Sequence, residues 1–157
     1  MVKVLTKKEV KLRIFDTYLA VIENSCGTKM FKNLYADING VRTDITNEGD
    51  LSCAYFVSTV LLMFDSIERI HATVRSTVVD MENSGWVVTD EPIVGDVIVW
   101  NEKECRDGSR HSHIGFFVGQ NKAISNNKDL GCPTKHSLEM DGRGIEMYLT
   151  NHVLRAK

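Results

Sequence analysis

The chain changes its pattern between two stretches, Asp50-Leu51-Ser52-Cys53-Ala54-Tyr55-Phe56-Val57 and His113-Ile114-Gly115-Phe116-Phe117-Val118-Gly119. In the first, Asp50 and Ser52 are good helix N-cap residues, and apolar side chains follow at helical spacing. In the second, β-branched and aromatic residues form a short apolar run that is typical of a buried strand. The order predicts a helix with Cys53 in its first turn, followed later in the chain by a strand that begins near His113.

The same two patterns continue on either side of these stretches. Helical spacing predicts further helices over residues 7–24, with a capping box at residues 6–9, and over residues 72–83. Asn39-Gly40 predicts a short hairpin. Strand-like runs follow at residues 86–89, 97–100, 114–118, 122–125 and 145–149. Helices first and strands afterwards predict an α+β fold, with a five- or six-stranded antiparallel sheet packed against helices on one face.

Length and composition are those of an ordinary globular domain: 157 residues, of which 43% are hydrophobic and 25% charged. One core fits this length, so we expect residues 1–157 to form a single domain. The formal net charge of −2 gives no general attraction to nucleic acid or anionic lipid.

No targeting signal is expected at the N-terminus, because Arg13, Asp16 and Glu23 interrupt its apolar residues. The same interruptions argue against a membrane-spanning segment. Four cysteines without a C-x-x-C pair are typical of a reducing compartment, and the cytoplasm is the default expectation.

Cys53 and His113 are the candidate catalytic residues. A helix N-terminus carries roughly half a positive charge, which favours a thiolate there. With an imidazole nearby, such placement can lower a cysteine pKa from about 8.5 into the range of ~3.5–7.5. If the sheet brings His113 to the helix end, the two residues form a nucleophile and its base, and a third polar group is needed to orient the imidazole.

These two stretches, with Val94-Gly95-Asp96-Val97-Ile98-Val99-Trp100 between them, resemble the three signatures of NlpC-like peptidases and CHAP amidases. The resemblance covers about residues 45–130, and the order and spacing of the three blocks agree with the family. It implies a papain-like fold, with Cys53 as the nucleophile and His113 as the base. It also implies hydrolysis of an amide or peptide bond, often in the peptide stems of bacterial cell wall, with no cofactor and no metal.

The third catalytic residue of this family lies on the strand after the histidine, and it is usually His, Asn, Gln or Glu. Direct alignment of that strand places Ser125 there, and serine is a poor orienter of imidazole. Asn126 and Asn127 are chemically better, since an amide oxygen accepts an imidazole N–H. We select Asn126, although strand alternation puts Ser125 and Asn127 together on the other face.

Other interpretations stay open. Cys53 also fits a small buried core residue, and the domain would then be a non-catalytic interaction module on the same fold. Zinc is the competing chemistry, although the spacing of its candidate ligands matches no zinc pattern: Cys105, His111, His113, Cys132 and His136.

The substrate is also open. Cell-wall peptide, cleaved by a phage-type or otherwise released lysin, is one class; an intracellular amide, isopeptide or thioester is another. The sequence does not define the oligomeric state.

Overall fold

The structure is a computed structural model that describes residues 9–104 and 108–157. Within these residues, three helices and a hairpin come first: α1 (Ile14–Asn24), β1 (Tyr35–Ile38), β2 (Val41–Asp44), α2 (Cys53–Met63) and α3 (Val74–Asn83). The remaining elements are β3 (Val87–Thr89), β4 (Val97–Glu104), β5 (Arg110–Gly119), β6 (Lys122–Asn127), β7 (Cys132–Ser137), β8 (Ile145–Thr150) and α4 (His152–Ala156).

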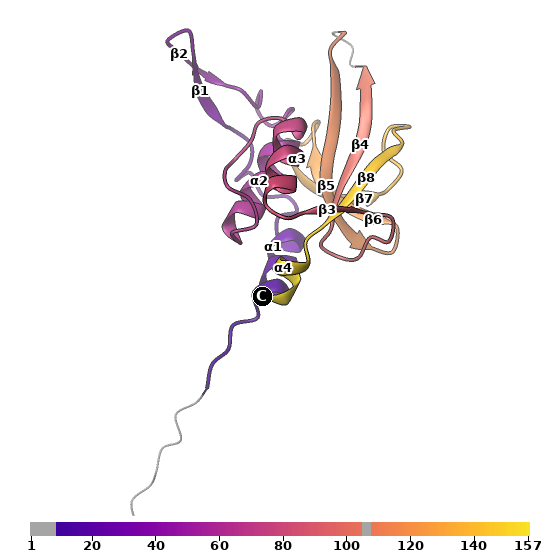
Figure 1. Cartoon of the computed structure of the whole chain (residues 1–157). Helices are drawn as coiled ribbons and strands as arrows, with labels where there is room; N and C mark the ends of the chain where they lie inside the picture. Colours follow the sequence, from indigo (N-terminus) through magenta and orange to yellow (C-terminus); the bar gives the residue numbers. More distant parts are fainter. Residues whose placement is uncertain (1–8, 105–107) are drawn as a thin grey trace, which may run out of the picture.

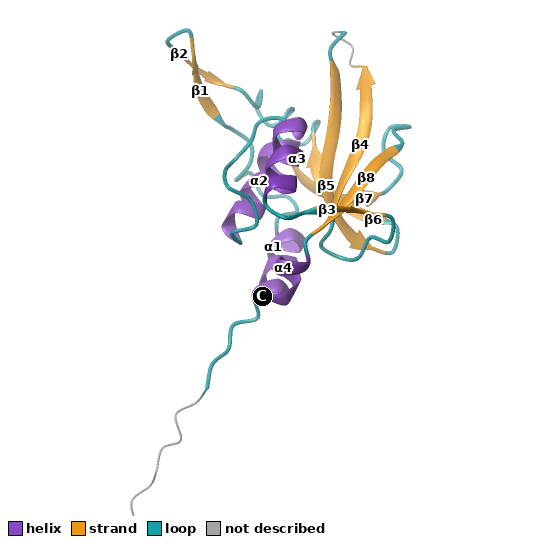
Figure 2. Ribbon diagram, viewed as in Figure 1, coloured by secondary structure: helices purple, strands orange, loops and turns teal. Residues whose placement is uncertain are grey.

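Six of the strands form one sheet in the order β3-β8-β4-β5-β6-β7. All neighbours in it are antiparallel. The helices gather on one side of this sheet, and the β1–β2 hairpin projects away from it (Figures 1 and 2). The prediction of an α+β fold with a six-stranded antiparallel sheet is therefore confirmed. No helix in the described part of the chain is long and apolar enough to cross a membrane.

The main core lies between α2 and the sheet. Helix α2 is apolar on almost all sides, as expected for a buried helix, and six of its residues are buried: Ala54, Phe56, Val57, Ser58, Val60 and Leu61. Its apolar side chains pack with Ile114 and Phe116 of β5. Each fully buried aliphatic or aromatic side chain of this kind stabilises the fold by about 1.5–3 kcal/mol. This packing fixes the position of the N-terminus of α2 over the sheet.

A second, smaller apolar cluster lies on the other face of the sheet. Ile98 and Trp100 are fully buried there together with Ala123. His113 is opposite Trp100 in the β4–β5 register, so its side chain lies on this second face. The imidazole of His113 packs against the Trp100 indole, with ring centroids 5.6 Å apart.

Helix α1 starts later than the sequence predicts. It begins at Ile14, and Glu9 of the predicted capping box lies outside it. The first residues of that box, 6–8, lie outside the described residues. Val10 and Leu12 are exposed, so burial does not support an additional turn of helix before Ile14.

Two elements were not predicted at all. Strand β7 begins with Cys132-Pro133 and continues with four polar residues, so it lacks the alternation of apolar and polar residues that is typical of a strand. Proline is tolerated because β7 is at the edge of the sheet and pairs only with β6. Helix α4 has only five residues, and the side chain of Asn151 caps it by accepting the N–H of Leu154.

Asp80 of α3 holds the loop between α2 and α3. Its carboxylate accepts the N–H groups of Glu68 at 3.0 Å and Arg69 at 3.1 Å. The same carboxylate lies 2.7 Å from Nε2 of His71, whose main-chain N–H donates to Ser58 Oγ at 2.9 Å. Asp80 is buried, so these partners replace the water it loses. The loop is thereby fastened to both helices.

Asp80→Ala is expected to lower the free energy of unfolding by about 2–4 kcal/mol, because it leaves buried donors without an acceptor. Burial raises the pKa of Asp80, but the hydrogen bonds from His71 and the loop outweigh it, and the net pKa is lowered. The contribution is therefore present above the usual carboxyl pKa of about 3.9 and is lost as the pH falls below it.

Urea denaturation of the wild type and Asp80→Ala, at about pH 7 and about pH 3, measures both effects. The exposed Glu82 on the same helix provides the control, and Glu82→Ala is expected to change stability by less than about 0.5 kcal/mol. Equal losses for the two variants at neutral pH would contradict the role of Asp80.

Candidate active site

Helix α2 places Cys53 at its first position. The carbonyl of Ser52, the N-cap residue, accepts the N–H of Phe56 at 2.8 Å and so begins the helical hydrogen bonds. The side chain of Ser52 makes no cap bond: its Oγ is buried and has no hydrogen-bond partner among the described residues. The N–H groups of the first turn therefore stay available near the sulfur of Cys53.

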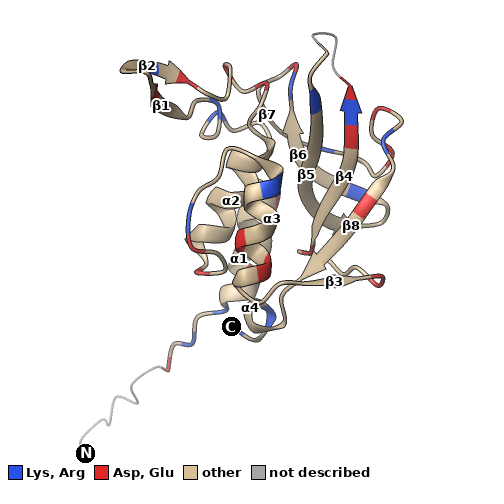
Figure 3. Cartoon of the chain, turned by 45° about the horizontal axis from the view of Figure 1, so that its top comes forward, with Lys and Arg blue, Asp and Glu red and all other residues tan. Residues whose placement is uncertain are grey.

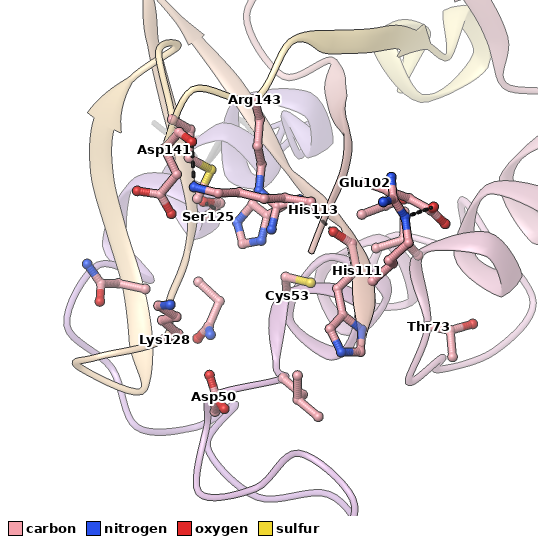
Figure 4. Close-up of a pocket in the computed structure, with 18 of the residues that line it drawn as sticks. Asp50, Cys53, Thr73, Glu102, His111, His113, Ser125, Lys128, Asp141 and Arg143 are labelled. Atoms are coloured by element: carbon pink, nitrogen blue, oxygen red, sulfur yellow. Dashed lines mark hydrogen bonds and ion pairs between the residues drawn. The ribbon is translucent and has the colours of Figure 1, made fainter. Parts of the chain in front are cut away.

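Cys53 lies against β5 where that strand separates from β6. The pairing of β5 with β6 runs from Gly119↔Lys122 to Gly115↔Ser125 and does not extend to His113. At this point the main-chain N–H of Ile114 is near enough to the sulfur of Cys53 to help lower the pKa of the thiol. The sulfur therefore lies beside the residue that follows His113, and Cys53 and His113 line the same cavity (Figure 4).

His113 belongs to a chain of hydrogen bonds that crosses three strands. Its Nε2 is 2.8 Å from Oγ of Ser125 on β6, which is completely buried. The same Oγ is 2.7 Å from Nε2 of His136 on β7. The other ring nitrogen of His136, Nδ1, is 2.6 Å from the carbonyl oxygen of Ser137. The imidazole of His113 is thus held by a serine, and that serine is held by a second histidine.

The prediction that Asn126 orients His113 is corrected by this geometry. Asn126 points to the opposite face of β6, where its Nδ2 donates to the carbonyl of Gly49 at 2.7 Å. It fastens β6 to the segment that precedes α2. Asn127 is also occupied elsewhere, since its Oδ1 accepts the N–H groups of Asp129 and Leu130. The partner of His113 is Ser125, the residue that direct alignment indicates and strand alternation favours.

The sequence indicates His136 only as a candidate zinc ligand. Its place in the chain of hydrogen bonds depends on the register of β6 with β7, in which Ala123 is opposite His136. Because β7 has no recognisable strand pattern, the sequence carries no signal that would bring His136 to Ser125.

The proposed zinc ligands do not assemble in the described residues. Cys105 lies outside them. His111 bonds Oγ of Ser109 at 2.9 Å, whereas His113 and His136 both bond Ser125. Within residues 9–104 and 108–157, no group of three or more His, Cys, Asp or Glu side chains is arranged to hold a metal ion.

Cys53 and His113 line a cavity of about 1320 Å³. Pockets for small molecules usually have about 300–1,000 Å³, so this one has room for an extended ligand. Its charged lining residues are of both signs and come from several elements: Asp50, Arg75, Glu102, Lys103, Glu104, Arg110, Lys128, Asp129, Glu139, Asp141 and Arg143. Figure 3 shows charges of both signs at the neighbouring ends of β4 and β5.

Arg143 is a charged residue that shifts the pKa values of both Cys53 and His113. Its Nη1 donates to the carbonyls of Asn101 at 2.8 Å and of His111 at 2.5 Å, which fix the guanidinium at the cavity. The positive charge lowers the pKa of the Cys53 thiol and also that of His113. It therefore favours a thiolate and disfavours an imidazolium.

Burial decides the charge state of the pair. It raises the pKa of the Cys53 thiol, and the N–H groups of Ile114 and Ala54 and the charge of Arg143 only partly oppose this effect. Burial also lowers the pKa of His113 to about 3, with smaller electrostatic contributions from Arg143 and His136. Both groups are consequently neutral near pH 7. The expectation of a thiol pKa lowered by the helix N-terminus is corrected, because desolvation outweighs it.

No protein-family model matches the chain, and a search of curated proteins finds no match.

Alkylation of Cys53 by iodoacetamide is expected to rise steadily with pH and to show no acid plateau, because the thiol pKa lies above its usual value. The rates at each cysteine, read by peptide mass spectrometry from about pH 5 to about pH 10, test this expectation. The exposed Cys26 reports the reactivity of the reagent in the same sample. A Cys53 rate that stays constant between about pH 5 and about pH 8 would reveal a preformed thiolate and contradict the neutral pair.

Proposed function

We propose that the protein is a cysteine hydrolase that cleaves an amide or peptide bond, with Cys53 as the nucleophile and His113 as its base. The observation that carries the proposal is the position of the Cys53 sulfur. It is at a helix N-terminus, on the wall of a large cavity that is also lined by a histidine whose Nε2 is bonded to Ser125. A cysteine that served only packing would not need a cavity or a held imidazole next to it.

The first half of the reaction transfers the acyl group to the enzyme. His113 Nδ1 takes the proton of the Cys53 thiol as the sulfur attacks the substrate carbonyl, since both groups are neutral at rest. The N–H groups at the start of α2, including that of Cys53, hold the oxyanion. His113 then gives its proton to the leaving amine, the C–N bond breaks, and a thioester on Cys53 remains.

The second half returns the enzyme to its starting state. His113 takes a proton from water as the water attacks the thioester, the C–S bond breaks, and the carboxylic acid leaves. The proton on His113 then returns to the sulfur. The scheme uses no cofactor.

The substrate class that we propose is a peptide, with bacterial cell-wall peptide first. The resemblance to NlpC-like and CHAP enzymes points to that class, and a cavity of about 1320 Å³ with both signs of charge suits a zwitterionic peptide. The alternative is an intracellular amide, isopeptide or thioester. We place the protein in the cytoplasm, where a nucleophilic thiol stays reduced, with a released phage-type lysin as the alternative.

A packing role for Cys53 is the competing function, and one observation also fits it: burial raises the thiol pKa, as in a core cysteine. Under that alternative the domain would bind a partner without chemistry. This alternative would be favoured if the wild type showed no hydrolytic activity and if Cys53→Ala and Cys53→Ser both lowered the stability of the protein.

Hydrolysis is tested by the appearance of new amino groups when the purified chain is incubated with muropeptides or, separately, with a casein digest. Cys53→Ala and His113→Ala are expected to lower the rate at least about 1,000-fold, because each removes a group that takes part in bond cleavage. Thermal denaturation of each variant checks that it is folded.

Cys26→Ala is the matched control, since Cys26 is an exposed thiol that does not line the cavity. It is expected to keep the wild-type rate. Cleavage that survives Cys53→Ala, or the absence of cleavage with both substrates, would count against the hydrolase.

A further inference from the structure

The protons on the chain from His113 to Ser137 can be assigned one by one. The carbonyl oxygen of Ser137 can only accept, so Nδ1 of His136 carries a proton. In the neutral imidazole, Nε2 of His136 is then an acceptor, and the hydroxyl of Ser125 donates to it. Oγ of Ser125 accepts in turn from Nε2–H of His113. Nδ1 of His113 is left with its lone pair free.

A serine alone would not determine this outcome. Its hydroxyl can donate or accept, so Ser125 is compatible with either tautomer of His113. An amide or carboxylate oxygen in the same position would determine the tautomer by itself, because it only accepts. The direction of the Ser125 hydroxyl is instead set by His136, and the direction of His136 is set by a main-chain carbonyl that cannot change its role.

The indole of Trp100 keeps the two imidazoles in place. Its ring centroid is 5.6 Å from that of His113 and 5.8 Å from that of His136, and its Nε1 donates to the carbonyl of Leu138 at 3.0 Å. Trp100 and Ser125 are completely buried. The hydroxyl therefore has protein partners in place of water, and a fixed direction of donation can persist.

We propose that His136 is a positioning residue that selects, through Ser125, the tautomer of His113 with a free Nδ1. Its importance for catalysis rests on the proposed function, since Nδ1 is the atom that takes the proton of Cys53. The tautomer itself does not rest on it and can be observed without a substrate. The opposite tautomer, with a proton on Nδ1, would be unable to act as the base for the thiol.

The direct test is long-range ¹H–¹⁵N correlation NMR of the histidine side chains at about pH 7, where a neutral imidazole shows separate ¹⁵N shifts for its protonated and unprotonated nitrogens. We expect the Nε2–H tautomer for His113 and the Nδ1–H tautomer for His136. In His136→Phe, His113 is expected to show a mixture of both tautomers, because Ser125 has lost the group that sets its direction.

His136→Gln is the conservative variant, because its side-chain amide oxygen can accept from Ser125. It is expected to restore the Nε2–H tautomer of His113 at least in part. In hydrolysis assays we expect His136→Phe to lower kcat by about 10–100-fold with little change in KM, and His136→Gln to lie between it and the wild type. A residue with only a structural role would change the stability of the protein and leave the tautomer as it is.

An Nδ1–H tautomer of His113 in the wild type would overturn the inference, and so would an unchanged Nε2–H tautomer in folded His136→Phe. The wild-type spectrum needs no variant, so a His136→Phe protein that fails to fold does not remove the test. The expected tautomers together with no cleavage of any substrate would reject the hydrolase while leaving the role of His136 in place. Hydrolysis that requires Cys53, together with the Nδ1–H tautomer of His113, would support the hydrolase and reject the role of His136.

Discussion

The packing of α2 against β5 is the contact on which the candidate site depends. Helix α2 has buried apolar residues on most of its surface, so it has little freedom to slide or turn over the sheet. This rigid contact brings the first residue of the helix, Cys53, to the main chain of Ile114, the residue that follows His113. The main-chain pairing of β5 with β6 ends nearby, at Gly115 and Ser125. A loosely held helix could not maintain such a pair.

The same burial has an electrostatic consequence. It raises the pKa of the Cys53 thiol and lowers that of His113 to about 3, so the resting pair is uncharged. In a site of this kind, the transferable proton and the lone pair that receives it must face each other before the substrate binds. The tautomer of His113 then matters more than its charge. Ser125 and His136 act on that property, which explains why a residue as ambiguous as serine can occupy the orienting position.

Local patterns sufficed for the elements that have a strong apolar period or a clear turn signal. The hairpin at Asn39-Gly40, the helix that begins at Cys53 and the strand that contains Ile114 all lie where the sequence predicts them. Strand β7 escaped prediction because an edge strand needs no apolar alternation, and α1 begins late because the exposed Val10 and Leu12 do not support its first turn. Cys53 and His113 could be selected as candidates because one begins a helix and the other lies in a strand run. Strand alternation favours Ser125 as the partner of His113, whereas side-chain chemistry alone favours Asn126. His136 depends on a strand register that no local pattern encodes.

The central claim is that Cys53 carries the acyl group and that His113 makes this step possible. Brief reaction with p-nitrophenyl acetate, quenched in acid and read by peptide mass spectrometry, measures acetylation at every cysteine. The account predicts that acetyl accumulates on Cys53 of the wild type and then disappears by hydrolysis, and that His113→Ala slows its formation by about 100-fold or more. Acetylation of the exposed Cys26 without any on Cys53, or an equal rate on Cys53 with and without His113, would contradict it.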